Sequence, residues 1–227
     1  MGLHTRLYRL GAGLMSALFL LLLLAPGSSA QEFRDRESRA GLTIGPGFQG
    51  GASMIIESRE TQKIKPIFAW RAGIHTTYPL NEVISAGLGL GLDNRGTREH
   101  VFNNSDLYAD TRVMYFSLYP NFVFGGFNLG FNLGFPLSAS YTTANGTSTS
   151  ISDTEDLPLL LEPRVGVTIP LVDVKEGWLS VVFGTGFSFT PLIDYPEPTD
   201  FFGDWRNVSA HLGLRFEFGI PGTERED

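Results

Sequence analysis

Residues 127–137 read FNLGFNLGFPL, with a large apolar residue at every second position. The positions between them hold only asparagine, glycine and proline. Because side chains alternate across a β-strand, this stretch presents one apolar face and one small, polar face. A strand of a soluble sheet can show the same alternation, so the rest of the chain decides what it means.

Seven further stretches repeat the alternation, and each covers about the 9–11 residues that a tilted strand needs to cross a bilayer. They are residues 41–55, 67–78, 83–92, 112–124, 159–169, 179–189 and 207–220. After residue 30 no apolar run is long enough for a spanning helix, and a closed barrel is then the remaining way to cross a membrane. We predict an all-β fold, an eight-stranded antiparallel up-and-down transmembrane β-barrel over residues 41–220.

The N-terminus has the pattern of a secretory signal peptide. Arg6 and Arg9 precede an almost wholly apolar run from Leu14 to Leu24, and small residues lead up to Ala30. This order predicts a signal peptide over residues 1–30 that is cleaved after Ala30; an uncleaved membrane anchor is the alternative. The chain has no cysteine, which excludes a thiol-linked lipid anchor and any disulfide.

The predicted connections alternate between short and long. The short ones are residues 79–82, 125–126 and 172–177, and the long, polar ones are residues 57–65, 93–110, 142–156 and 191–204. Short periplasmic turns and long extracellular loops are typical of barrels in the outer membrane of Gram-negative bacteria. We therefore expect an integral outer-membrane protein surrounded by lipid, with a flexible periplasmic lead-in (residues 31–40) and a charged C-terminal tail (residues 221–227).

Charge and composition exclude several classes of partner and cofactor. Removal of the signal peptide takes away two arginines and no acid, so the net charge moves from −7 to −9. An acidic chain of this kind argues against nucleic acid as a partner. The sequence has no phosphate-binding loop, zinc-ligand spacing or nucleotide fingerprint, and we predict no metal, cofactor or catalytic residue.

Aromatic residues occur at both ends of the predicted strands. Amphipathic rings favour the headgroup region of a membrane, so these residues predict two aromatic girdles. The periplasmic girdle consists of Tyr78 and Trp178, and the extracellular girdle of Tyr108, Tyr141 and Trp205.

Four prolines lie inside predicted strands, where each removes a hydrogen-bond donor that a closed barrel needs. They are Pro46, Pro120, Pro136 and Pro163. We expect local bulges at these positions, or strand ends nearer than the alternation suggests.

The predicted inward face carries charged and aromatic polar residues. Eight strands enclose a space just wide enough for side chains to fill, and charges buried there need partners. We therefore expect an ion-pair network that plugs the barrel; a gated pore or a proton-sensitive switch using the two histidines is the alternative. The network residues are Arg71, His75, Tyr115, Tyr119, Glu162, Arg164, His211, Arg215 and Glu217.

Two segments carry a resemblance to a known family. Residues 73–96, GIHTTYPLNEVISAGLGLGLDNRG, look like the second hairpin of PorT-type outer-membrane β-barrel domain proteins. Residues 114–122, MYFSLYPNF, are similar to the next strand of that family. The resemblance implies an eight-stranded barrel in the outer membrane of Gram-negative bacteria, mostly without assigned chemistry, with some members linked to a protein secretion apparatus.

Three functions and one structural alternative follow from these patterns. We favour a structural or interaction role through the extracellular loops, and we expect a protein partner at the cell surface or in the periplasm. A narrow, porin-like passive channel is the second candidate, because glycines line several inward faces. A lipid-modifying enzyme using Ser209, His211 and Glu217 is the third, although Ser209 and His211 lie about 6–7 Å apart in an extended strand. An exported soluble barrel would instead need a polar outer face.

Overall fold

The computed structural model describes residues 41–56, 63–100, 107–151, 157–174, 177–192 and 206–223. The predicted signal peptide (residues 1–30) and the predicted lead-in (residues 31–40) lie outside the described residues, as does most of the predicted tail. Among the described residues, no helix has the length and apolar character needed to cross a membrane.

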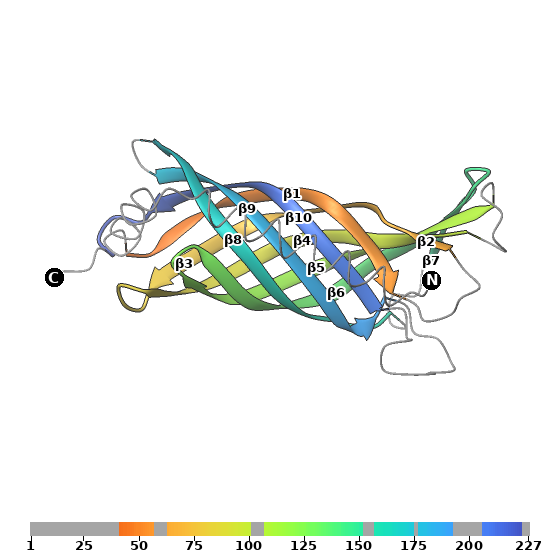
Figure 1. The fold of residues 1–227 in the computed structure, drawn as a ribbon, viewed down its shortest axis with the longest axis horizontal. Helices are drawn as coiled ribbons and strands as arrows, with labels where there is room; N and C mark the ends of the chain where they lie inside the picture. The colour runs from red at the N-terminus through yellow and green to blue at the C-terminus, as the bar shows by residue number, and fades with distance from the viewer. Residues whose placement is uncertain are drawn as a thin grey trace, which may run out of the picture.

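Eight long antiparallel strands form a closed ring, in which β1 pairs with both β3 and β10 and β4 pairs with β5. The ring strands wind obliquely around one axis (Figure 1). Their bounds are β1 Thr43–Ile56, β3 Ile67–Pro79, β4 Ile84–His100, β5 Tyr108–Phe124, β6 Phe127–Thr143, β8 Leu160–Val174, β9 Gly177–Pro191 and β10 Arg206–Gly219. The prediction of an eight-stranded antiparallel up-and-down barrel is therefore confirmed.

The outer face of the barrel is apolar, as the alternation predicts. In β10, Leu212 and Leu214 are 59% and 49% exposed, whereas their inward neighbours His211 and Arg215 are buried. Phe122 and Leu129 are similarly exposed on β5 and β6. An apolar surface that surrounds the molecule suits hydrocarbon and not water, so the barrel is a transmembrane one. The alternative of a soluble barrel with a polar outer face does not fit.

The two ends of the barrel differ. One end holds the start of β1, the end of β10 and the short turns, including the two-residue turn Gly125–Gly126. Both turn glycines have positive φ, 55° and 94°, as a type I′ hairpin turn requires. The other end carries the long connections and two short added strands, β2 (Lys63–Lys65) paired with β4 and β7 (Ser148–Ile151) paired with β6 (Figure 1).

The prediction of a long loop over residues 93–110 is wrong for most of this segment. Strand β4 continues to His100 and strand β5 already begins at Tyr108. Alternation continues on the inward side, because Asp93 and Arg95 are fully buried. The outward-facing residues of β4 change instead from apolar to polar, beginning at Asn94. The Asn94 side chain accepts a hydrogen bond from Arg112. The strand therefore continues beyond the apolar belt, where an alternating hydrophobic pattern no longer reveals it.

The expected bulge is confirmed at one of the four prolines. The register of β5 against β6 shifts where Met114 faces Ser138 and Tyr115 faces Pro136, which leaves Leu137 as the extra residue. Beyond this bulge Ala139 faces inward. At Pro46, Pro120 and Pro163 no register shift occurs, so the expectation of a bulge is wrong there. The pairing is interrupted instead: Pro46 is not paired with β10, Pro120 is not paired with β6, and the β8–β9 pairing begins only after Pro163.

Candidate functional site in the barrel lumen

A compact ion-pair network crosses the lumen near the end with the long connections. Arg95 of β4 binds Glu162 of β8 through Nη1–Oε1 at 2.8 Å and binds Asp93 through Nη2–Oδ2 at 2.5 Å. All three side chains have no exposed surface. Arg71 and Arg164 complete the network: Arg71 Nη2 lies 2.7 Å from Asp93, and Arg164 contacts both carboxylates.

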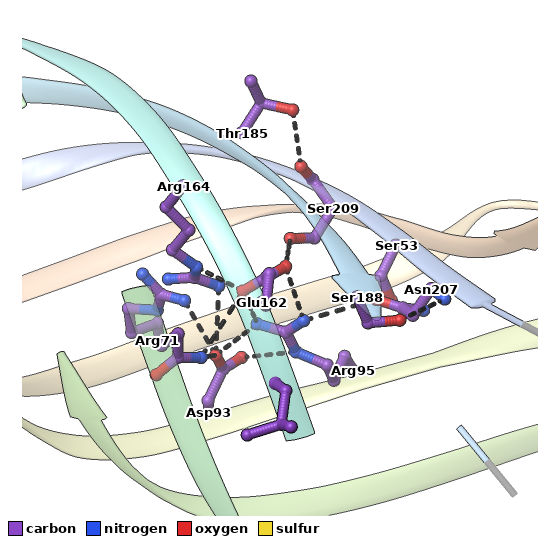
Figure 2. Close-up of polar contacts among 12 residues, drawn as sticks. Ser53, Arg71, Asp93, Arg95, Glu162, Arg164, Thr185, Ser188, Asn207 and Ser209 are labelled. Carbon is purple, nitrogen blue, oxygen red and sulfur yellow. Dashed lines mark hydrogen bonds and ion pairs between the residues drawn. The ribbon is translucent and has the colours of Figure 1, made fainter. Parts of the chain in front are cut away.

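The network is held from several strands at once. Figure 2 shows the three arginines converging on the two carboxylates. Ser209 of β10 donates a hydrogen bond to Glu162 Oε1 at 3.0 Å, and Asn132 of β6 donates to Asp93 Oδ2 at 3.3 Å. Because its members come from β3, β4, β6, β8 and β10, this network ties opposite walls of the barrel together. We call this set of residues the upper network: Arg71, Asp93, Arg95, Asn132, Glu162, Arg164 and Ser209.

Two central members of the upper network are absent from the sequence prediction. Asp93 and Arg95 fall in the segment that the alternation assigns to a loop. A usable signal exists in the sequence, since both continue the odd-numbered inward series of Gly89 and Gly91. It is hidden because the outward residues beside them are no longer apolar.

An apolar cluster lies next to the upper network at the same end of the barrel. Its members come from four ring strands, β1, β5, β6 and β8, and from the residues that adjoin β8 and β9. They are Ile55, Val113, Tyr115, Ala139, Leu157, Leu160 and Leu192, with Ile64 packed against them. We call this cluster the apolar cap; it adds buried side chains to the lumen beside the upper network.

A second polar cluster closes the end with the short turns. Glu217 Oε2 accepts a hydrogen bond from Trp178 Nε1 at 3.1 Å and lies 3.1 Å from Arg215 Nε. The hydroxyls of Thr43 and Thr77 lie 3.5 and 3.4 Å from Glu217 Oε1. All five side chains are buried, and we call them the lower cluster.

A cavity of about 100 Å³ lies between the upper network and the lower cluster. It borders Arg71 and Arg164 on the network side and Arg215 on the other. His75 and His211 also line it, and the Nε2 atom of each is buried without a hydrogen bond. Within the described residues, no cluster of His, Asp and Glu side chains could hold a metal ion.

The nine predicted lumen residues separate into four environments. Arg71, Glu162 and Arg164 belong to the upper network, and Arg215 and Glu217 to the lower cluster. The cavity is lined in part by His75, Tyr119 and His211. Tyr115 differs from expectation: it packs in the apolar cap, and its hydroxyl has no hydrogen-bond partner among the residues that the structure describes.

The predicted girdle residues do not all lie at the membrane surface of the barrel. Tyr78 and Tyr141 are 52% and 41% exposed, as a membrane-interface residue requires. Tyr108 begins β5 and lies under the guanidinium of Arg98, 4.2 Å from its ring centroid. Trp178 is a correction: only 6% exposed and bonded to Glu217, it faces the lumen, because it shares the even-numbered inward series of β9. Trp205 lies outside the described residues.

The glycines on the inward faces differ in how much free space lies at the position of an added Cβ atom. A Cβ atom added at Gly73 or Gly91 would collide with the backbone of the paired strand, so these glycines allow close strand approach. An added Cβ at Gly184 has only the Val165 carbonyl oxygen within 4 Å, at 3.7 Å. Glycine content alone therefore does not indicate an open pore, although it leaves space beside Gly184.

The three residues suggested for an enzyme are not assembled as a catalytic group. Ser209 donates its hydroxyl hydrogen to Glu162, and Glu217 belongs to the lower cluster. Nothing in the described part of the chain joins Ser209 to His211 by a hydrogen bond. The nucleophile–base contact that this hypothesis needs is therefore missing.

Comparison with solved structures finds several distant likenesses. Ail, the attachment invasion locus protein of Yersinia pestis, has 16% sequence identity and a TM-score of 0.41, over 78% of this chain and 99% of that chain. Neisserial surface protein A has 9% identity and a TM-score of 0.36, over 79% and 97%. The outer membrane protein OprG from Pseudomonas aeruginosa has 12% identity and a TM-score of 0.34, over 80% and 98%.

No protein-family model and no curated protein matches the chain. The resemblance to PorT-type proteins therefore stays a prediction. The closed strand pairing described above, and not these distant likenesses, establishes the fold.

Proposed function

We propose that the mature chain is an integral protein of a Gram-negative outer membrane that serves a structural or interaction role through its extracellular end. The observation that carries this proposal is the set of buried side chains that extends across the lumen. Arg95 and Glu162 have no exposed surface, and the apolar cap lies beside them. We expect a barrel filled in this way to offer solutes no continuous path, which favours a role at the surface over transport.

At the end with the long connections, a paired β-hairpin extends beyond the apolar part of the barrel. The β4–β5 hairpin stays paired as far as His100 and Tyr108, and β2 adds to its edge. Arg98 fastens this hairpin through two hydrogen bonds to Asp110, at 2.6 and 2.7 Å. A paired hairpin of this kind presents its side chains in fixed positions, as a protein-binding surface requires.

The proposed orientation predicts where a water-soluble label can reach the chain in intact cells. The chain has no cysteine, so Asn145→Cys in the β6–β7 turn and Glu82→Cys in the β3–β4 turn each introduce a single thiol. We expect a membrane-impermeant maleimide to label Asn145→Cys in intact cells and Glu82→Cys only after the outer membrane is permeabilised. The reverse pattern would overturn the orientation, and recovery of the protein in the soluble fraction would overturn the location.

The closed lumen has its own test. Proteoliposomes that contain a channel swell in an isotonic solution of a sugar small enough to pass. We expect no swelling with arabinose for this protein, and swelling with a general porin reconstituted in the same lipid. Swelling at a rate proportional to the amount of this protein would favour the narrow passive channel instead.

A further inference from the structure

The cavity in the middle of the lumen has an unusual chemical lining. Its charged and titratable lining residues are three arginines, two histidines and a tyrosine: Arg71, Arg164, Arg215, His75, His211 and Tyr119. Among the described residues that border it, none is an aspartate or glutamate. The three nearby carboxylates belong to the upper network and the lower cluster, outside this lining.

Several polar nitrogen atoms of these lining residues have no hydrogen-bond partner among the described residues. The Nε2 atoms of His75 and His211 and the Nε atom of Arg71 are buried and make no hydrogen bond to any described residue. The side chains of the two histidines are 8% and 2% exposed. A buried polar group without a partner is destabilising, so native structures supply one from protein, water or a bound ion.

The charges around the cavity also do not balance. The upper network and the lower cluster together contain four arginines, Arg71, Arg95, Arg164 and Arg215, against the carboxylates Asp93, Glu162 and Glu217. One positive charge is in excess when the histidines are neutral. In a medium of low dielectric constant, an uncompensated buried charge is costly and attracts an ion of opposite sign.

We propose that this cavity binds one small inorganic anion, of the size of chloride or sulfate. Its volume of about 100 Å³ admits such an ion, and the lining combines cationic groups with N–H donors. Asn128 and Asn132 also line it and have amide oxygens without hydrogen bonds, but these oxygens are neutral and repel an anion far less than a carboxylate does. The site goes beyond the surface role proposed above and does not depend on it.

The first experiment measures the thermal unfolding midpoint of the full mature chain, refolded into detergent. Gluconate, a bulky organic anion, serves as the reference salt, and chloride or sulfate replaces it at constant ionic strength. A ligand that binds only the folded state raises the midpoint with its concentration. We expect chloride, sulfate or both to raise it in a saturable way; no saturable rise with either anion would overturn the proposal.

Two variants test whether the effect arises in this cavity. His75→Phe combined with His211→Phe removes both N–H donors without breaking an ion pair, and should weaken anion affinity about tenfold or more. Gly184→Val adds a side chain where the Cβ position has open space, and should also weaken binding. His100→Phe is the matched control, because His100 is a buried histidine with two unpartnered nitrogens that does not line the cavity.

The control should bind the anion as the native protein does. Equal loss of affinity in His100→Phe and in the cavity variants would overturn the proposal, as would unchanged affinity in folded cavity variants. If the double variant does not fold, crystals of the native protein grown in bromide give the answer. An anomalous peak between His75 and His211 supports the site, and a lumen without any such peak contradicts it.

Discussion

At the scale of single residues, the lumen depends on arginines that each serve more than one carboxylate. Arg95 binds Asp93 and Glu162 while fully buried, and Arg164 contacts the same two acids. Removal of one partner from such a group leaves buried charges without compensation. The cost of that loss is usually larger than the net contribution of the intact pair.

Glu162→Gln therefore tests the upper network. The substitution keeps the size of the side chain but removes the charge that faces Arg95 and Arg164, and we expect it to lower the free energy of unfolding by about 3–5 kcal/mol. Urea unfolding in lipid vesicles measures this change. Asp110→Asn is the matched control, because it breaks the partly exposed Asp110–Arg98 pair and should cost about 0–1 kcal/mol. Equal costs for the two variants would contradict a special role of the network.

Trp178 provides a second test at this scale, because its predicted place in the girdle was wrong. Two single-tryptophan proteins can be compared, one that keeps Trp178 and one that keeps Trp70, which lies on the outward series of β3 beside the exposed Phe68. We expect lipids with brominated acyl chains to quench Trp70 strongly and Trp178 weakly. Strong quenching of Trp178 would place it against lipid and remove its contact with Glu217.

At the scale of elements, the strand that decides the fold also contains its clearest irregularity. Over residues 127–135 the strand β6 alternates regularly, and the bulge at Leu137 then reverses the alternation. Simple alternation would place Ala139 against lipid, whereas the structure buries it in the apolar cap. The break coincides with Pro136, which cannot donate a hydrogen bond to the neighbouring strand.

Cysteine labelling tests this reversal, since the native chain contains no cysteine. We expect Ser138→Cys, on the exposed side, to react readily with a maleimide in detergent, and Ala139→Cys, inside the cap, to react slowly. The opposite order of rates would mean that β6 runs without a bulge.

The sequence predicts the elements inside the membrane better than those outside it. In β10, apolar and polar residues alternate throughout the strand, and the predicted range 207–220 differs from the observed one by a single residue at each end. In β4, the prediction ends at Leu92 although the strand continues to His100. Only lipid contact requires an apolar outer face, so the pattern disappears where the strand leaves the membrane.

The limit of the apolar pattern also explains which lumen residues could be predicted from the sequence. Glu162, Arg164 and Arg215 stand on the inward faces of regular strands and are correctly predicted to point inward. Their partners Asp93 and Arg95 lie just beyond the apolar belt, and the periodicity does not reach them. The sorting into an upper network, a cavity and a lower cluster depends on contacts between distant strands, which no local pattern contains.

At the scale of the whole molecule, the barrel is a closed ring in which every long strand has two neighbours. Such a ring has no free edge and keeps its backbone hydrogen bonds in detergent. We expect the native protein to resist sodium dodecyl sulfate until it is boiled, and the boiled and unboiled samples to migrate differently on a gel. Identical migration, with solubility in buffer without detergent, would contradict a membrane barrel.

The central claim is that side chains close the lumen from within, by the apolar cap, the upper network and the lower cluster. Electrical conductance across a planar lipid bilayer tests it most directly, because small ions pass through openings that exclude sugars. We predict no steady conductance from the native protein under conditions in which a general porin gives regular current steps. Steady current steps from the purified, folded native protein would contradict the claim and make the barrel a channel.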